Sequence, residues 1–181
     1  MNAQYPRVAG YVIGIGSNID PEANVPRILD ALLRHFGHLS MSRILRTQPV
    51  DMASAREFFN LAVFVETQIA PAALKNICNG IECALGRDRG DPSRALKDRV
   101  ADLDILFALD PGEPLPALAQ VDGVYFQPVV ADIYGLLGLP VTAGGVAGVT
   151  IRLGEVSAGE VPATIHRDGR TGQIVVVEQR P

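Results

Sequence analysis

Two aspartates separated by one residue, Asp102 and Asp104, are the strongest candidates for chemistry, because they interrupt an apolar stretch that continues through Phe107. Alternate residues of a β-strand point to the same face, so a strand here places both carboxylates side by side. Two like charges on a partly buried face repel each other, which favours a cation between them. Mg²⁺ is the expected cation, since it prefers oxygen ligands and often binds one or two carboxylates together with substrate phosphates.

A basic segment lies directly before these aspartates. Residues 87–99 include five Lys or Arg against three Asp, although the whole chain has a formal net charge of -4. The basic residues are Arg87, Arg89, Arg94, Lys97 and Arg99. A solvated loop is the plain interpretation of such a run, but guanidinium groups also bind phosphate oxygens in pairs, and Arg99 comes only three residues before Asp102. Together the two features favour metal-assisted phosphoryl transfer.

The composition is that of one folded domain. A chain of 181 residues that is 48% hydrophobic can bury one core, so residues 1–181 are expected to form a single domain. The acidic balance argues against a nucleic-acid partner. The sequence has neither an apolar run long enough to span a bilayer nor an apolar leader, so we expect no membrane partner and a cytoplasmic location. Cys78 and Cys83 are expected as free thiols. The oligomeric state is left open.

Alternating strand-like and helix-like patterns must position the candidate residues. Strands are expected at 9–16, 39–47, 58–67 and 101–108, and helices at 21–36 and 71–85. Asp20 is expected as the N-cap of the first helix, and Gly86 as the residue that ends the second. The order β-α-β-β-α-β predicts an α/β (α+β) fold with a ferredoxin-like core over residues 9–108.

The rest of the chain is expected to form a connection and a β-rich C-terminal extension. The connection covers 109–148 and includes a short helix at 128–138. The extension covers 149–181, with strands at 149–153, 161–166 and 173–178.

Two further motifs have both a structural and a functional interpretation. Asn60 is a polar amide in an apolar strand, so it must be hydrogen-bonded. It either bonds a neighbouring loop or recognises the edge of a heterocycle, with Phe58 or a neighbour stacking on that ring. Gly14-x-Gly16-Ser17-Asn18 lacks the third glycine of a dinucleotide-binding loop, which favours a tight turn that brings the backbone close to another group.

In combination, four segments resemble the 6-hydroxymethyl-7,8-dihydropterin pyrophosphokinase family. They are Ile13–Asn18, Leu45–Val50, Phe58–Val63 with Glu66-Thr67, and the run from Ile81-Glu82 through Gly86-Arg87-x-Arg89 and Arg99 to Leu106. The resemblance covers roughly residues 9–108. It implies Mg²⁺-dependent transfer of the β,γ-pyrophosphoryl group of ATP to the hydroxymethyl oxygen of a reduced pterin in folate biosynthesis, leaving AMP.

The resemblance also implies individual roles. Asp102 and Asp104 would bind two Mg²⁺ ions and, with Arg99, form the catalytic set. The residues that would bind ATP are Glu82, Arg87, Arg89, Lys97 and Arg99. The residues that would hold the pterin are Thr47, Val50, Phe58 and Asn60.

Some residues typical of the family are missing. The chain has no Trp, no His in 39–165 and no Lys or Arg in 100–151, so the family's Pro-His-Pro element and downstream Arg have no counterpart. Val124 takes the place of the family's pterin-stacking Phe, unless Tyr125 or Phe126 substitutes. These departures motivate an alternative, namely a catalytically weakened pterin- or nucleotide-binding paralogue with a regulatory or related-pterin role.

Overall fold

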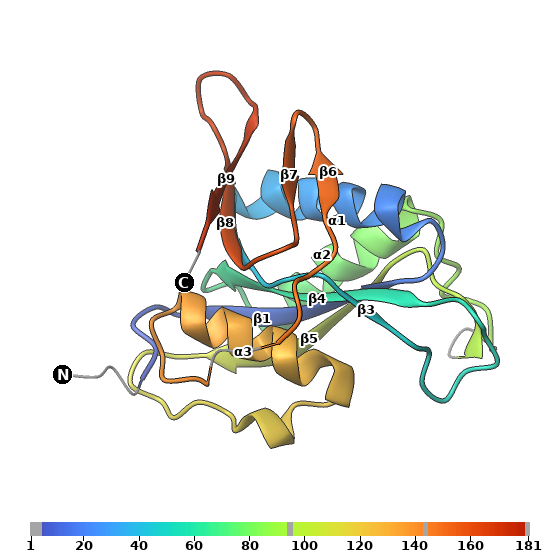
Figure 1. Cartoon of the computed structure of the whole chain (residues 1–181), viewed down its shortest axis with the longest axis horizontal. Helices are drawn as coiled ribbons and strands as arrows, with labels where there is room; N and C mark the ends of the chain where they lie inside the picture. Colours follow the sequence, from blue (N-terminus) through green and yellow to red (C-terminus); the bar gives the residue numbers. More distant parts are fainter. Residues whose placement is uncertain (1–4, 94–95, 143–144, 180–181) are drawn as a thin grey trace.

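The computed structural model of the chain describes residues 5–93, 96–142 and 145–179, so Arg94 of the basic segment lies outside the described residues. The chain combines three α-helices with strands of two sheets over the described residues (Figure 1). They are β1 (Gly10–Ser17), α1 (Pro21–Phe36), β2 (His38–Met41), β3 (Leu45–Thr47), β4 (Phe58–Glu66), α2 (Pro71–Ala84), β5 (Asp102–Leu109), the 3₁₀ turns η2 (Leu118–Gln120) and η3 (Val124–Phe126), α3 (Gln127–Leu136), β6 (Ile151–Leu153), β7 (Val156–Ala158), β8 (Ala163–Arg167) and β9 (Ile174–Glu178).

One antiparallel sheet runs through the molecule in the order β5-β1-β4-β2-β8-β9, with β3 paired to β4. The first four of these strands, with α1 and α2 between them in the chain, have the arrangement expected of a ferredoxin-like core, which confirms the predicted α+β class. In Figure 1, α1 and α2 lie on one side of the sheet and α3 lies on the other.

The expected strand at 39–47 is divided into β2 and β3, which corrects the prediction. At Ser42 the chain is still held to β4, because the Ala62 N–H donates to Ser42 Oγ over 2.9 Å. Ile44 then pairs with the C-terminal segment instead: its N–H donates to the Gly159 carbonyl, and its own carbonyl accepts from Val149. This pairing joins segments far apart in the chain, so no local sequence pattern predicts it, and it interrupts the expected strand at 39–47.

The helices α1 and α2 begin and end within one residue of the positions predicted from the sequence. α1 begins at Pro21, and Asp20 occupies the N-cap position, although its side chain makes no capping hydrogen bond. Its backbone carbonyl instead accepts from the N–H groups of Ala23 and Asn24. α2 ends at Ala84, and Gly86 follows with a φ of 97°, a conformation that glycine adopts without steric cost.

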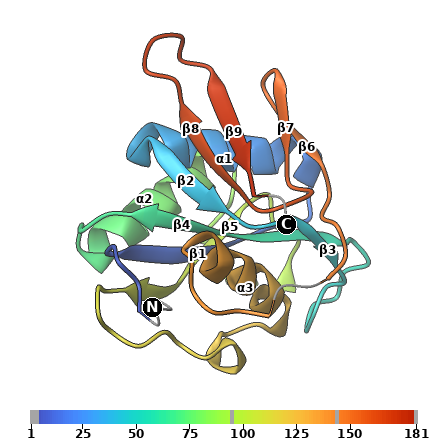
Figure 2. The same cartoon turned by 60° about the vertical axis from the view of Figure 1, so that its left-hand side comes forward.

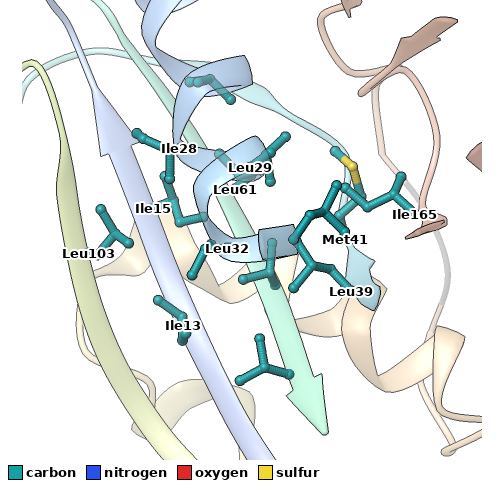
Figure 3. Packing of buried hydrophobic residues seen from close by; sticks show 14 of the residues in the cluster. Ile13, Ile15, Ile28, Leu29, Leu32, Leu39, Met41, Leu61, Leu103 and Ile165 are labelled. Carbon is teal, nitrogen blue, oxygen red and sulfur yellow. The ribbon is translucent and has the colours of Figure 1, made fainter. Parts of the chain in front are cut away.

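The larger hydrophobic core lies between the sheet and the helices α1 and α2. Figure 3 shows its centre, where Ile28, Leu29 and Leu32 of α1 lie over side chains from several strands. The strand residues labelled there are Ile13, Ile15, Leu39, Met41, Leu61, Leu103 and Ile165. Because strand residues alternate between faces, Gly14 and Gly16 belong to the opposite face, together with Asp102 and Asp104 of β5.

The smaller core lies on that opposite face, under α3. Val129, Val130 and Ile133 of α3 belong to one buried cluster with Val12 and Phe64 of the sheet. α3 is the short helix expected at 128–138, and it begins one residue earlier. The ring of Phe126, just before α3, lies over Gly14, whereas a pocket opens at Gly16.

The C-terminal strands extend the main sheet. β8 pairs with β2, and β9 pairs with β8, while Ile165 of β8 contributes to the larger core. β6 and β7 form a separate two-stranded sheet next to α1 (Figure 2). β7 was not among the expected strands, because three residues are too few for an alternating pattern to be recognised. Over the described residues, every helix is too short or too polar to cross a membrane.

Candidate active site

The candidate site lies on the α3 side of the sheet, where β5, β1 and β4 run side by side. Gly16 of β1 is paired with Asp102 on one neighbour and with Asn60 on the other. Gly14 is likewise paired with Asp104. A Cβ at Gly16 would lie 2.9 Å from Asn60 Oδ1, so the absence of a side chain keeps the space between Asn60 and Asp102 open.

A pocket of about 210 Å³ opens above Gly16. Its lining comprises Gly16, Thr47, Gln48, Val50, Asp51, Met52, Phe58, Asn60, Arg99, Asp102, Tyr125 and Phe126. The structure therefore brings together the four residues expected to hold a pterin and two of the three expected in catalysis. The pocket combines aromatic rings, an amide and charged groups, as small-molecule sites commonly do.

Asn60 is held in a defined orientation inside this pocket. Its side chain is almost fully buried, and its Nδ2 donates to Thr47 Oγ1 over 2.7 Å. Thr47 belongs to β3 and is paired with Phe58 of β4, so the partner is positioned by the sheet itself. Since Nδ2 is used by Thr47, Oδ1 remains near Gly16 as an acceptor at the pocket floor.

Tyr125 and Phe126, which follow β5 in the chain, form another wall of the pocket. The ring centroids of Tyr125 and Phe126 are 4.7 Å apart, and the Phe126 ring covers Gly14 so closely that a Cβ there would lie 2.7 Å from it. Partial burial raises the pKa of Tyr125, so its hydroxyl stays protonated. The sequence offered both residues only as possible substitutes. Gln48 lies within the Leu45–Val50 segment that the resemblance included, whereas Asp51 and Met52 were not indicated, because they lie in a loop without periodicity.

Asp102 is enclosed by two arginines. Arg87 Nη1 donates to Asp102 Oδ1, and Arg99 Nη1 donates to Asp102 Oδ2. Asp104 is more exposed, and its nearest cation in an ion pair is the Lys75 ammonium, 3.8 Å away. Partial burial against the sheet and then the charge of Asp102 raise the pKa of Asp104. The two carboxylates therefore act on each other as like charges on one face, as their spacing predicts.

Glu82 lies behind the site rather than in it. Its side chain is 1% exposed, and it accepts hydrogen bonds from the Leu103 N–H over 2.7 Å, from Arg87 over 2.9 Å and from Arg89. The Glu82 carboxylate is thus enclosed and orients two arginines, and its expected part in ATP binding stays a prediction.

A second pocket of about 130 Å³ lies next to the first, on the side of the basic segment. Three basic residues, Arg87, Lys97 and Arg99, line it together with three acidic ones, Asp88, Asp91 and Asp98, and with Ile19, Gly86 and Val100. Lys97 forms an ion pair with Asp91, and hydrogen bonds from Lys97 and Ser93 lower the pKa of Asp91 to about 2. Among the described lining residues of the two pockets, Arg99 is the one they share.

The Ser17-Asn18 motif fixes the backbone next to Asp102. The Asn18 side chain accepts from the Arg99 N–H and donates to Asp98 Oδ1, both over 2.7 Å, while Ser17 Oγ donates to the Val100 carbonyl over 2.8 Å. The Asn18 N–H also donates to the Arg99 carbonyl. This is the close backbone approach that the motif suggested, and its effect is to position Arg99.

The donor chemistry of the aspartate pair fits a hard divalent cation. Within residues 5–93, 96–142 and 145–179, no group of three or more His, Cys, Asp or Glu is placed to hold a metal ion. Two neighbouring carboxylates next to open space instead match the kind of site in which Mg²⁺ takes its remaining ligands from water and substrate phosphates.

Comparisons with known proteins agree on one family. Residues 12–134 match the family model described as 7,8-dihydro-6-hydroxymethylpterin-pyrophosphokinase. Proteins named 2-amino-4-hydroxy-6-hydroxymethyldihydropteridine pyrophosphokinase are similar: that of Methylorubrum extorquens is 33% identical over 100 residues, covering 52% of this chain and 60% of the relative. That of Bacillus subtilis is 34% identical over 98 residues, covering 52% and 57%. That of Porphyromonas gingivalis is 30% identical over 97 residues, covering 52% and 66%. The matched part thus spans less than two thirds of these relatives.

Proposed function

The chain belongs to the 7,8-dihydro-6-hydroxymethylpterin-pyrophosphokinase family, and on this basis we propose that it transfers a pyrophosphoryl group from ATP to the hydroxymethyl group of 6-hydroxymethyl-7,8-dihydropterin. The observation that carries the proposal is the single pocket in which Asn60, Phe58 and Thr47 lie with Arg99 and Asp102. A heterocycle held by Asn60, Phe58 and Thr47 would have one edge directed at Arg99 and Asp102.

The pterin half of the pocket is suited to a flat, polar ring. Asn60 Oδ1 is available to accept from an amino or ring N–H group, because Nδ2 is bonded to Thr47. Phe58, Tyr125 and Phe126 supply aromatic surfaces on which a ring can stack. Val50, also in the lining, adds apolar contact from the loop after β3.

The transfer half of the pocket is suited to a polyphosphate. In the proposed reaction, the hydroxymethyl oxygen forms a bond to the β-phosphorus of ATP, the bond from that phosphorus to the α-phosphate breaks, and AMP leaves. Asp102 and Asp104 would hold two Mg²⁺ ions, which supply charge neutralisation and orientation of the phosphates when bound. Arg87, Arg99 and Lys97 would bind phosphate oxygens from the second pocket.

The missing downstream cations give this chain an unusual charge distribution for the reaction. Because residues 100–151 contain no Lys or Arg, we expect the positive charge next to the phosphates to come from the basic segment before β5, from Arg56, which pairs with Asp98 of that segment, and from Lys75. The paralogue alternative gains no support from the relatives, whose printed names are those of pyrophosphokinases. With ATP as donor, the cytoplasm is the compartment that suits the proposed activity.

The nature of the nucleotide product tests the proposal. We expect the purified protein, mixed with ATP, Mg²⁺ and 6-hydroxymethyl-7,8-dihydropterin, to release AMP in a pterin-dependent manner. ADP as the product, or AMP released equally without pterin, would contradict it. Pterin binding by calorimetry without any turnover would favour the binding paralogue.

A further inference from the structure

The Tyr125 side chain carries a hydroxyl group for which the stacking of an aromatic ring has no use. We propose that this hydroxyl donates a hydrogen bond to a non-bridging oxygen of the phosphoryl group that is transferred, on the side of the pocket where Asp102 lies. The inference rests on the proposed function, since it concerns the same reaction. It adds a neutral donor in a part of the chain, residues 100–151, that contains no Lys or Arg.

The first support is that the described residues provide no hydrogen-bond partner for the Tyr125 hydroxyl. The two buried tyrosines of the chain differ in this respect. Tyr11 Oη donates to the Ile69 carbonyl over 2.8 Å. Tyr134 Oη donates to the Pro116 carbonyl, also over 2.8 Å. Hydroxyl groups withdrawn from solvent are usually satisfied in this way. A ligand in the pocket that Tyr125 lines would supply the acceptor.

The second support is that the Tyr125 ring is held on two sides. It packs against the Phe126 ring, with 4.7 Å between the ring centroids. It also lies close to the backbone of Gly123, where an added Cβ would be 2.9 Å from Tyr125 Cζ and 3.2 Å from Tyr125 Oη. Gly123 has a φ of 80°, which glycine adopts without steric cost. The hydroxyl is therefore carried by a positioned ring, as a preorganised donor requires.

The third support is the set of charges that act on this hydroxyl. Partial burial raises the pKa of Tyr125, and the charge of Asp102 raises it further. Smaller effects on the same pKa come from Arg99, which lowers it, and from Asp104, which raises it. Asp51 lines the same pocket and is not among the groups that shift this pKa. The hydroxyl therefore belongs to the transfer side of the pocket, and it stays a protonated donor at neutral pH.

A phosphoryl oxygen is the acceptor that suits this donor. The oxygens of Asp102 already accept from Arg87 and Arg99, so the carboxylate does not take up the phenol. During phosphoryl transfer, negative charge is spread over the non-bridging oxygens of the transferred group. A preorganised donor directed at one of them stabilises the transition state in a partly buried site. The hydroxyl keeps its proton throughout, so the hydrogen bond changes neither the atoms nor the charges of the proposed reaction.

Tyr125→Phe tests the hydroxyl, because it removes the oxygen and keeps the ring. We expect kcat for AMP formation to fall about 10- to 100-fold, as for the loss of one hydrogen bond to a charged group. The KM for the pterin should change less than about twofold, since the stacking surface remains. Binding of α,β-methylene-ATP, which cannot donate the pyrophosphoryl group, should weaken less than about threefold, because the bond matters most in the transition state. Tyr134→Phe, which removes a hydroxyl outside the pocket lining, is the matched control and should leave all three values unchanged.

A pH profile tests whether the protonated form of the hydroxyl is required. A ring-fluorinated tyrosine at position 125 keeps both the ring and the hydroxyl but has a more acidic phenol. Its kcat should decline at a lower pH than that of the wild type, because a phenolate cannot donate a hydrogen bond. The same replacement of Tyr134 should leave the pH profile as it is. A residue with a purely structural role would not move this profile.

The outcomes separate this inference from the proposed function. If the wild type forms AMP and Tyr125→Phe keeps the same kcat, the hydroxyl has no part in the transfer, and the proposed function stands. A higher KM for the pterin at an unchanged kcat would place the hydroxyl against the pterin and overturn the inference as well, as would an unshifted pH profile of the fluorinated variant. If the wild type forms no AMP, the proposed function is wrong and the inference falls with it.

Discussion

Asn60 and Asp102 face the same side of the sheet from β4 and β5, one on each flank of Gly16 in the strand between them. Strand spacing is about 5 Å, so an amide and a carboxylate two strands apart are separated by roughly the width of a fused heterocycle. Gly16 leaves this interval open, since any Cβ there would press on Asn60. Backbone pairing thus sets the spacing between the residues that we propose to hold the pterin and to take part in the transfer.

Asp102→Asn should remove activity. The amide cannot supply the negative charge that a divalent ion requires, so we expect AMP formation to fall by about 10³-fold or more. Asp110→Asn, an exposed carboxylate just after β5, is the control and should retain full activity. Substantial AMP formation by Asp102→Asn would contradict the metal assignment.

Asn60→Ala should weaken pterin binding selectively. Loss of the acceptor at the pocket floor is expected to cost about 1–3 kcal/mol, which raises the Kd for the pterin roughly 10- to 100-fold. Binding of α,β-methylene-ATP should change little, and calorimetry can measure both ligands. Asn76→Ala, on the exposed surface of α2, provides a variant of the same type away from the pocket. Equal losses for the two ligands would indicate a general structural defect instead.

Gly14→Ala should displace the aromatic wall. The added Cβ would lie 2.7 Å from the Phe126 ring, so the ring has to move, at an expected cost of about 1–3 kcal/mol in the free energy of unfolding. The pterin Kd should rise at the same time, because Phe126 lines the pocket. The double variant Gly14→Ala/Phe126→Leu should recover part of the lost stability in urea unfolding. Additive losses would mean that the strain arises elsewhere.

Glu82→Gln should destabilise the protein even though the residue does not face the pocket. The substitution leaves Arg87 and Arg89 without their buried carboxylate, and such a loss is expected to cost about 3–5 kcal/mol. Glu57→Gln, in the exposed pair with Arg46, should cost about 0.5 kcal/mol or less. Urea unfolding of the two variants side by side makes the comparison. Similar stabilities for both would show that the Glu82 network is not stabilising.

The two cysteines should differ in reactivity and in their contribution to pH dependence. Burial raises the pKa of Cys78 to about 11, whereas Cys83 is exposed. At pH 8, iodoacetamide should therefore modify Cys83 in the folded protein and Cys78 only after unfolding. Because the unfolded thiol titrates near 9 and the folded one near 11, the contribution of Cys78 to stability is complete below pH 9 and is lost as the pH rises towards 11.

The matching stability measurement is denaturant unfolding between pH 8 and pH 11. Cys78→Ala should flatten the decline in this range relative to the wild type, while Cys83→Ala should leave it unchanged. Modification of Cys78 in the folded protein at pH 8 would argue against its burial.

The sequence by itself determined the features that depend on neighbours along the chain. Alternation along a strand is a local property, so the shared face of Asp102 and Asp104 and the position of Asn60 followed from spacing. Backbone preferences of single residues likewise predicted the helix starts at Pro21 and Pro71 and the end of α2 before Gly86. The strand order was accessible because β-α-β-β-α-β leaves few ways to cover one sheet with two helices.

Only the tertiary structure decided how distant segments meet. Phe126 lies over Gly14 because α3 packs on the face opposite α1, and no periodicity in the sequence specifies that face. The enclosure of Glu82 and the attachment of Arg99 to Asn18 likewise join residues far apart in the chain. Local patterns determine which elements form and which faces are apolar, whereas burial, ion pairing and a pocket require contacts that the fold alone brings together.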